Sequence, residues 1–264
     1  MKNIPAILER TVFMSDLHME MRGYDSSAFQ SIEADLVILA GDVGVGAHGM
    51  EWAQRTFSCP VIYLAGNHEY YHSNLWVNRA ALMQTSSDNI HFLDCNSVLI
   101  GGVRFVGATF WTDFKLRGEP MRVVCMREAQ TRMNDFRLIT TPDGPLTPAY
   151  TSQLHQVARD FIKQVVSESA EPVVVITHHT PSDITTQSRY AMDFLTAAFS
   201  SNADDLMNPK ILAWICGHTH HSGIWLSRGV PILSNQLGYP RESGTGFRPG
   251  LTIADAIREV RQLN

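Results

Sequence analysis

Five short motifs carry carboxylate, amide and imidazole side chains in an order that suits the binding of metal ions. Together these groups are the ligands that hold Mn²⁺, Fe or Zn²⁺, whereas Ca²⁺ takes only oxygen. A pair of such cations activates water for hydrolysis and neutralises developing negative charge. The motifs are Ser15-Asp16-Leu17-His18, Gly41-Asp42, Gly66-Asn67-His68-Glu69, Thr177-His178-His179 and Gly217-His218-Thr219-His220.

An apolar run of strand length precedes each motif. These runs do not alternate cleanly between apolar and polar residues, which predicts strands buried on both faces of a sheet. In open parallel sheets, ligands bind beyond the carboxyl ends of the strands, so we expect all five motifs to meet at one edge. The predicted strands are 11–14, 36–40, 61–65, 103–106, 173–176 and 211–215.

The spacing within the motifs also favours a metal site. Asp16 and His18 are two residues apart, as are His218 and His220, and an extended segment would place both side chains of a pair on the same side. A lone Asp-x-His or Gly-Asp is usually an ordinary turn, but five motifs in order, each after a strand, are hard to explain by chance. Three glycines allow the backbone to turn tightly beside the ions: Gly41, Gly66 and Gly217.

Helical patterns alternate with the predicted strands, which indicates the α/β class. Segment 74–85 follows Ser73, a plausible N-cap. Segment 148–166 follows Thr147, and its first residue, Pro148, suits the first helical position. We expect this second helix to pack an apolar stripe on a sheet. The stripe comprises Leu154, Val157, Ala158, Phe161, Ile162, Val165 and Val166.

The length of 264 residues is compatible with a single domain spanning 1–264. Segment 112–144 differs from its surroundings because it is rich in charge and methionine. We interpret it as an insertion that could lie over an active site, and a plain surface excursion is an equally good interpretation.

The ordered set of motifs resembles the calcineurin-like metallophosphoesterase superfamily, from the first strand to beyond residue 220. The resemblance implies a two-sheet β-sandwich flanked by helices, with two divalent metal ions (Mn, Fe or Zn) at one edge. One metal would be held by Asp16, His18, Asp42 and His220. The other would be held by Asp42, Asn67, His178 and His218, with Asp42 as the bridge. Two adjacent cations need a shared anionic ligand, so elementary chemistry also assigns Asp42 this place.

The activity that the resemblance implies is hydrolysis of a phosphomonoester or a phosphodiester. The expected step is in-line attack by a hydroxide that bridges the two metals, with Asp42 and His68 as catalytic residues. His68 would stabilise the transition state or protonate the leaving group. The expected partner is a small phosphate-ester substrate, and the sequence carries no signal of an oligomeric state.

Some positions of this sequence differ from those of known branches of the superfamily, and these differences indicate which branch it resembles most. The arginines that protein serine/threonine phosphatases carry near Gly-Asp and Gly-Asn-His are missing here, and lipid-A precursor pyrophosphatases have arginine at the position of His68. The chain is more similar to small bacterial members, including those similar to cyclic-nucleotide phosphodiesterases. Residues 235–240 (Asn-Gln-Leu-Gly-Tyr-Pro) are similar to a loop of uncharacterised bacterial members. Their positions in the sequence make three arginines candidates for binding substrate: Arg132, Arg137 and Arg241. The alternative is that each of them is an ordinary arginine on the solvated surface.

Several neighbours of the motifs have simpler interpretations. His179 and His221 adjoin predicted ligands, and we expect them to support the site or the fold, although His179 could reach substrate. Glu69 is expected to orient a neighbour. Tyr70 and Tyr71 are expected to pack in the core, with substrate contact as the alternative.

Two other classes of function remain as alternatives. A non-catalytic protein-binding scaffold of the same fold would usually lack metal ligands, and here every position is filled. A nuclease would need a basic, aromatic-lined groove, which the formal net charge of −5 disfavours, so nucleic acid is an unlikely partner. No apolar stretch is long enough to cross a membrane, and residues 1–10 show no signal-peptide pattern. We therefore expect a cytoplasmic location, with the four cysteines reduced.

Overall fold

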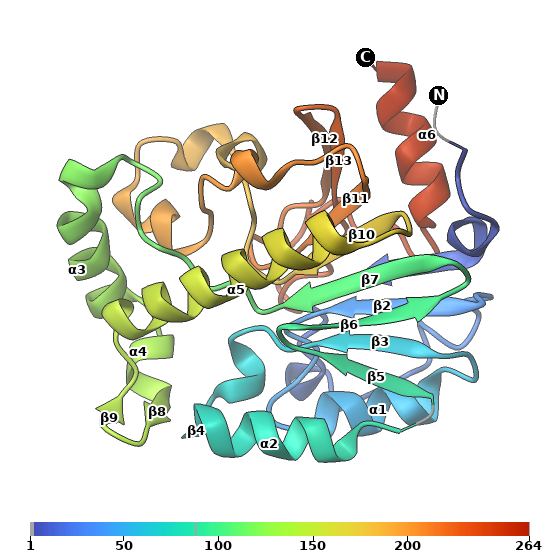
Figure 1. Ribbon diagram of the computed structural model, residues 1–264. Helices are drawn as coiled ribbons and strands as arrows, with labels where there is room; N and C mark the ends of the chain where they lie inside the picture. Colours follow the sequence, from blue (N-terminus) through green and yellow to red (C-terminus); the bar gives the residue numbers. More distant parts are fainter. Residues whose placement is uncertain (1–2, 88, 264) are drawn as a thin grey trace.

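Two β-sheets lie face to face at the centre of the molecule in a computed structural model that describes residues 3–87 and 89–263 (Figure 1). The first sheet is parallel, with the order β1-β2-β3-β5. It consists of β1 (Thr11–Met14), β2 (Leu36–Ala40), β3 (Val61–Leu64) and β5 (Ile90–Leu93).

The second sheet has six strands, in the order β12-β13-β11-β10-β7-β6. Its inner strands are parallel, and its two edge strands, β12 and β6, run antiparallel to their neighbours. The strands are β6 (Asn96–Ile100), β7 (Val103–Ala108), β10 (Val173–Thr177), β11 (Ile211–Cys216), β12 (Gly223–Ser227) and β13 (Val230–Ser234). A small third sheet joins β4 (Ser73–Asn74), β8 (Ile139–Thr141) and β9 (Gly144–Pro145).

Helices cover the outer faces of the sandwich (Figure 1). The α-helices are α1 (His48–Thr56), α2 (Leu75–Thr85), α3 (Arg122–Arg132), α4 (Asp135–Leu138), α5 (Pro148–Glu168) and α6 (Ile253–Leu263). Short 3₁₀ helices span Ala6–Arg10, Met19–Met21, His68–Tyr70, Glu119–Met121, Asp183–Thr185, Ser188–Tyr190, Phe194–Ala198 and Asp204–Leu206.

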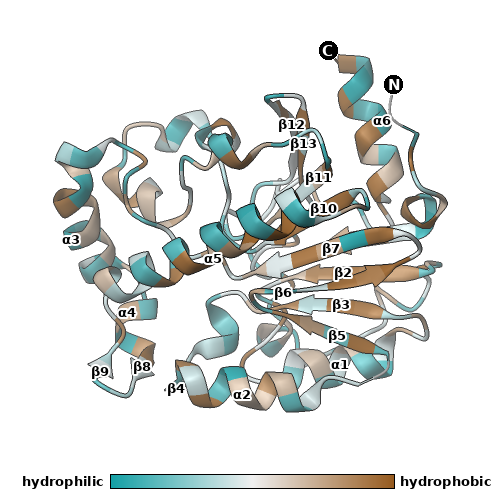
Figure 2. Cartoon of the chain, in the orientation of Figure 1, coloured by the Kyte–Doolittle hydropathy of each residue, from teal (hydrophilic) through white to brown (hydrophobic). Residues whose placement is uncertain are grey.

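Side chains of each inner strand enter two different cores, as successive residues of a strand point to opposite faces. In β2, Ile38 packs between the two sheets, while Val37 packs on the side of α1. In β10, Ile176 packs between the sheets, while Val175 faces Ile162 of α5. Figure 2 shows strands of the sandwich largely in brown, the colour of hydrophobic residues. The α/β class, and the two-sheet sandwich flanked by helices, are therefore confirmed.

The six predicted strands all form, and their bounds differ by at most two residues. The third ends at Leu64 rather than at residue 65, and β7 continues to Ala108. The helix from Pro148 also forms, and the Thr147 side chain accepts a hydrogen bond from the Tyr150 backbone N–H. Among the described residues, no helix combines the length and the apolar character needed to cross a membrane.

Two details of the predicted helices are wrong. The N-cap of α2 is Asn74 and not Ser73, because the Asn74 side chain accepts hydrogen bonds from the backbone N–H groups of Trp76 and Val77. Val157 does not belong to the buried stripe of α5, since 59% of it is exposed. The face of α5 that turns inward instead includes His155.

Candidate metal centre

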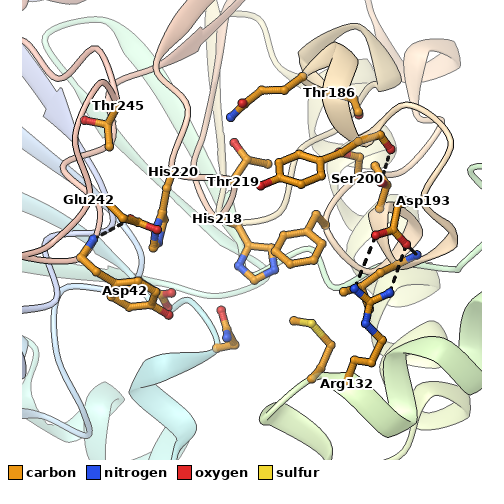
Figure 3. A pocket seen from close by; sticks show the side chains of 18 of the residues that line it. Asp42, Arg132, Thr186, Asp193, Ser200, His218, Thr219, His220, Glu242 and Thr245 are labelled. Carbon is orange, nitrogen blue, oxygen red and sulfur yellow. Dashed lines mark hydrogen bonds and ion pairs between the residues drawn. The ribbon is translucent and has the colours of Figure 1, made fainter.

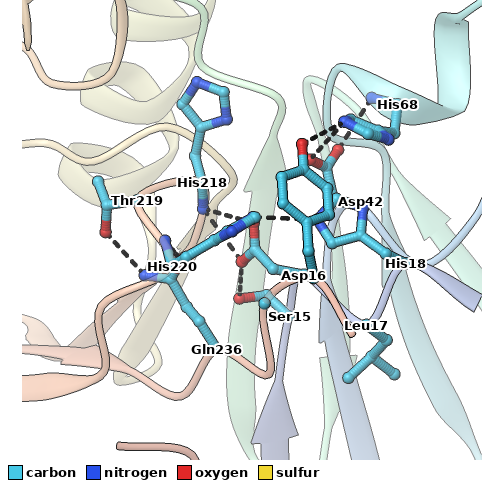
Figure 4. Close-up of polar contacts among 12 residues, drawn as sticks. Ser15, Asp16, Leu17, His18, Asp42, His68, His218, Thr219, His220 and Gln236 are labelled. Carbon is cyan, nitrogen blue, oxygen red and sulfur yellow. Dashed lines mark hydrogen bonds and ion pairs between the residues drawn. The ribbon is translucent and has the colours of Figure 1, made fainter. Parts of the chain in front are cut away.

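The loops after β1, β2, β3, β10 and β11 meet at the carboxyl-terminal edge of the sandwich. Figure 4 shows Asp16, Asp42, His68 and His218 from these loops close together. Hydrogen bonds tie loops from different strands together. The backbone N–H of His18 donates to the Asp42 carbonyl at 3.0 Å, and the backbone N–H of His218 donates to the Asp16 carboxylate at 3.0 Å. His178 Nδ1 lies 3.0 Å from the Ala40 carbonyl oxygen. The seven predicted ligands are thereby brought to one place.

Asp16, His18 and His220 form a group that we call the first cluster. One ligand atom from each lies within 4.8 Å of the other two. The Nε2 atoms of His18 and His220 are 3.0 Å apart, and His220 Nε2 is 3.6 Å from Asp16 Oδ1. Asp16 and His18 are fully buried. Three potential ligand atoms therefore face one point.

Asp42, Asn67, His178 and His218 form the second cluster. His178 Nε2 lies 3.1 Å from His218 Nδ1, 3.1 Å from Asn67 Oδ1 and 3.4 Å from Asp42 Oδ1. All four residues are buried. Among the described residues, the buried His218 Nε2 has no hydrogen-bond partner. The structure places Asp42 in this cluster, and its bridge to the first cluster remains a prediction.

Charge and burial act in opposite directions on the second cluster. Burial lowers the pKa of His178, but the Asp42 carboxylate outweighs burial and raises that pKa to about 10. Burial, and then the neighbouring His179 and His178, hold the pKa of His218 well below its usual value. Burial raises the pKa of Asp42, yet His178 and His68 outweigh it and hold the pKa well below the usual range. The site therefore holds a buried carboxylate that is stabilised by positive charge.

Five of the predicted ligands adopt a left-handed backbone, which is uncommon for residues other than glycine. The extended conformation predicted for Asp-x-His and His-x-His is therefore wrong, because both members of each pair have a positive φ. Strained residues of this kind are often found at functional sites, where the surrounding structure holds them. The φ angles are 55° at Asp16, 46° at His18, 53° at Asp42, 72° at His218 and 49° at His220.

Glu69 holds the ends of β2 and β3 together. Its buried carboxylate accepts hydrogen bonds from the backbone N–H groups of Asp42 (3.0 Å), Val43 (2.9 Å) and Gly66 (2.7 Å) and from the Tyr63 hydroxyl (2.8 Å). Burial, together with the Asp42 charge, raises the pKa of Glu69 to about 7. These contacts fit the predicted orienting role of Glu69.

Gly66 allows the close approach of β3 to the second cluster. A Cβ atom at Gly66 would overlap Asp42 Oδ1 and would lie 2.7 Å from His178 Nε2. Any side chain at this position would therefore displace two of the predicted ligands.

His68 lies beside both clusters and contacts two residues that the motifs did not reveal. Its Nδ1 is 3.0 Å from Glu20 Oε1, and its Nε2 is 3.3 Å from the Tyr239 hydroxyl and 3.9 Å from Asp42 Oδ2. Burial lowers the pKa of His68, but the charges of Asp42 and Glu20 outweigh burial and raise it to about 9. An imidazolium here would present a proton on Nε2 toward the cavity. Glu20 follows His18 at the same two-residue spacing that separates the members of each ligand pair. This spacing is the feature of the sequence that could have indicated Glu20 as a site residue.

A cavity of about 710 Å³ opens beside the clusters (Figure 3). Its floor includes Asp42, Asn67, His68 and His218, and its walls come from segments 132–134, 186–200 and 242–245 together with Tyr239. This volume is ample for a small phosphate ester with a sizeable substituent.

Of the arginines singled out from the sequence, Arg132 lies in the cavity wall, where its Nη1 is 3.3 Å from Asp193 Oδ1 (Figure 3). Arg137 and Arg241 lie outside the described wall, and Arg137 instead donates to Asn134. Arg189, which the sequence did not reveal, lines the wall and stacks over Tyr190 at 4.7 Å. No acidic side chain in the described part of the chain pairs with Arg189.

The two histidines that adjoin predicted ligands lie outside the described cavity wall. His179 Nδ1 is 3.1 Å from the Thr109 carbonyl oxygen, and its ring packs 4.2 Å from that of His218. Burial, and then the neighbouring His178, lower the pKa of His179 to about 3. His221 packs against Trp225. Both contacts fit supporting roles.

Comparisons with known proteins agree with this geometry. Residues 9–222 match the sequence family described as calcineurin-like phosphoesterase. Uncharacterized protein L509 of Acanthamoeba polyphaga mimivirus is 25% identical over 207 residues, which cover 72% of this chain and 71% of that protein.

Several solved structures share the fold. Phosphopantetheinyl hydrolase from Mycobacterium tuberculosis has a TM-score of 0.71 at 19% identity, and the match covers 88% of this chain and 90% of that chain. The protein TT1561 of Thermus thermophilus has a TM-score of 0.53 at 11% identity, over 86% of this chain and 89% of that chain. At these identities, the likeness shows the fold alone.

Proposed function

The chain belongs to the calcineurin-like phosphoesterase family, and from that premise we propose that it is a phosphoesterase that depends on two divalent metal ions. The observation that carries this proposal is the pair of neighbouring ligand clusters, which reach one cavity through Asp42, Asn67, His218 and His220. The substrate is a small phosphomonoester or phosphodiester.

The residues of both clusters fit such ions. Each cluster contains two imidazole nitrogens that face each other, at 3.0 Å in the first cluster and at 3.1 Å in the second. A buried carboxylate lies beside each pair, so the lone pairs within a cluster point to a common position. This mixed nitrogen and oxygen set suits Mn²⁺, Fe or Zn²⁺. We assign one ion to Asp16, His18, His220 and Asp42, and the other to Asp42, Asn67, His178 and His218. Divalent ions at these positions supply Lewis-acid activation of water and neutralise charge on the phosphoryl group.

His68 supplies the proton in this scheme. Its Nδ1 is held by Glu20, so its Nε2 is directed toward the cavity beside Tyr239. A proton on Nε2 can pass to the leaving oxygen of the ester, which is general acid catalysis. Asp42 lies beside His68 and raises its pKa, which favours the protonated form that a general acid needs.

The inserted segment contributes to the site in this proposal. We propose that residues 1–264 act as a single domain in which 112–144 forms part of the substrate site. Arg132, Met133 and Asn134 in the cavity wall support this assignment.

The test compares hydrolysis of p-nitrophenyl phosphate and bis-p-nitrophenyl phosphate with added Mn²⁺ and then with EDTA. Turnover of either ester that EDTA abolishes is the expected result, and the preferred ester decides between a monoesterase and a diesterase. A phosphopantetheine ester belongs in the next panel, because the M. tuberculosis neighbour is named for that chemistry. Absence of both turnover and bound metal would overturn the proposal and favour a binding scaffold.

A further inference from the structure

Asn67, Tyr71 and Asp135 close a ring of hydrogen bonds beside the second cluster. Asn67 Nδ2 donates to Asp135 Oδ1 at 2.9 Å and to the Tyr71 hydroxyl oxygen at 3.0 Å. The Tyr71 hydroxyl in turn donates to Asp135 Oδ1 at 2.8 Å. Asn67 and Asp135 are 2% and 3% exposed, so water does not compete with these bonds. Asp135 is the first residue of α4 and comes from the inserted segment, 68 residues after Asn67.

The ring is consistent with only one orientation of the Asn67 amide. The Tyr71 hydroxyl has a single proton, which it gives to Asp135, so its oxygen can only accept from Asn67. A carboxylate also accepts and does not donate. Burial raises the pKa of Asp135, and the hydrogen bonds from Tyr71 and Asn67 oppose that rise. Both neighbours therefore require the NH₂ group of Asn67.

This orientation leaves Asn67 Oδ1 facing the second cluster, 3.1 Å from His178 Nε2. The orientation matters because an amide binds a cation through its oxygen and not through its NH₂ group. A flipped amide would lose two hydrogen bonds and would place its carbonyl oxygen against the Asp135 carboxylate. Each buried polar group left unpaired costs about 1–3 kcal/mol.

We propose that Asp135 is a positioning residue that fixes the Asn67 amide with its oxygen toward the second cluster. The inserted segment is then part of the metal site as well as of the cavity wall. This inference rests on the proposed function, since it assumes that the second cluster binds a metal ion. It predicts that Asp135 controls metal affinity at that cluster and leaves the first cluster unaffected.

The test measures binding of Mn²⁺ to EDTA-stripped protein, by competition with a fluorescent chelator. In Asp135→Asn, the new amide can donate to Asn67 Oδ1 and favour the flipped form. We expect one of two Mn²⁺ sites to weaken about 10–100-fold, the usual effect of losing such a partner. Asp143→Asn removes the same charge from an exposed position of the same segment and should bind as the wild type does.

The double variant Asn67→Asp/Asp135→Asn separates positioning from simple packing. The carboxylate introduced at position 67 offers oxygen at both ends of its side chain, and the amide at position 135 can donate to one of them. We therefore expect the affinity to recover to within a few-fold of wild type, which restored packing alone would not produce. Tyr71→Phe removes one acceptor from the ring and should weaken the same site by a smaller factor.

The outcomes are distinguishable. If folded Asp135→Asn binds two Mn²⁺ ions with wild-type affinities, the positioning role is wrong and the proposed function stands. If the wild type itself binds no Mn²⁺, the proposed function falls and this inference falls with it. If Asp135→Asn does not fold, as judged by thermal unfolding, wild-type Mn²⁺ affinity in Tyr71→Phe overturns the inference.

Discussion

His18 Nε2 and His220 Nε2 face each other at 3.0 Å, although 202 residues separate them in the sequence. The opposite nitrogen of each ring lies beside a carboxylate. His18 Nδ1 is 3.4 Å from Glu20 Oε1, and His220 Nδ1 is 2.5 Å from Glu242 Oε2. A carboxylate at Nδ1 favours the tautomer with the proton on Nδ1, which leaves the Nε2 lone pair free. Both lone pairs then point to one position, as metal binding requires.

His220→Ala should therefore remove metal from the first cluster. We expect the content of tightly bound Mn²⁺ to fall from two ions to one, and phosphoesterase activity to fall by about 10²-fold or more. Equilibrium dialysis with elemental analysis measures the first effect, and p-nitrophenyl ester hydrolysis measures the second. His221→Ala is the matched control, because the adjacent imidazole lies outside the cavity wall. Equal loss of metal in both variants would contradict the assignment.

His68→Gln should separate catalysis from metal binding. The side chain touches Glu20 and Tyr239 and lies beside Asp42, but it belongs to neither cluster as we define them. We expect metal content to be retained and turnover to fall about 10²–10⁴-fold, the usual contribution of a general acid. Glu20→Gln should retain the metal and slow turnover less, because His68 loses its anchor but not its proton. Unchanged turnover in metal-loaded His68→Gln would rule out the acid role.

The inner strands could be predicted from sequence because they are buried on both faces and read as continuous apolar runs. The strands that the sequence did not reveal are mostly edge or interrupted strands. β6 (Asn96–Ile100) and β12 (Gly223–Ser227) are half exposed edges with mixed sequences. β13 is buried throughout but contains Pro231, which normally argues against an inner strand.

The predicted ligands could be found because each follows a strand within a few residues, so local spacing reports their position. Their supporting residues carry no such signal. Glu242 lies 22 residues from His220, and Asp135 lies 68 residues from Asn67. Contacts of this kind depend on how loops fold back over the edge of the sandwich, which the spacing of residues does not encode. The choice of arginines was right only in part for the same reason. Arg132 lies in the cavity wall as expected, Arg137 and Arg241 do not, and Arg189 was missed.

Arg189→Met should weaken substrate binding and leave the metals in place. Arg189 lines the cavity and stacks on Tyr190, and no acidic side chain among the described residues neutralises it. Its charge is therefore available to an anionic ester. We expect KM to rise about 3–10-fold with kcat nearly unchanged, which is the signature of lost ground-state binding. Arg137→Met removes an arginine outside the described cavity wall, and an equal rise in KM there would show that general surface charge is responsible.

His155 should make the stability of the protein depend on pH. This histidine of α5 is 1% exposed, its Nδ1 contacts the Trp111 carbonyl oxygen, and its ring packs 4.5 Å from that of Phe110. Within the described chain, its Nε2 has no hydrogen-bond partner. Burial lowers the pKa of His155 from 6.5 to about 4, and the nearby charges of Asp113 and Arg159 act in opposite directions.

The sign of the effect follows from this lowered pKa. As pH falls from 6.5 toward about 4, the unfolded chain takes up a proton that the folded protein excludes. The free energy of unfolding should therefore fall by up to about 1.4 kcal/mol per pH unit, roughly 3 kcal/mol in total. Above pH 6.5, His155 is neutral in both the folded and the unfolded protein, so it does not make the free energy of unfolding depend on pH. His155→Gln keeps a polar group at the Trp111 carbonyl but cannot titrate, so it should lack this part of the slope.

Urea unfolding of the metal-free wild type and of His155→Gln, at several values between about pH 4.5 and pH 8, measures the difference. EDTA treatment of both proteins removes the pH dependence of metal binding, and the other buried histidines contribute equally to the two curves. We expect the free energy of unfolding of the wild type to fall more steeply than that of His155→Gln below about pH 6.5. The wild-type value minus the variant value should therefore decrease as the solution becomes more acidic. Parallel curves across this range would mean that His155 takes up its proton equally well in the folded and the unfolded protein.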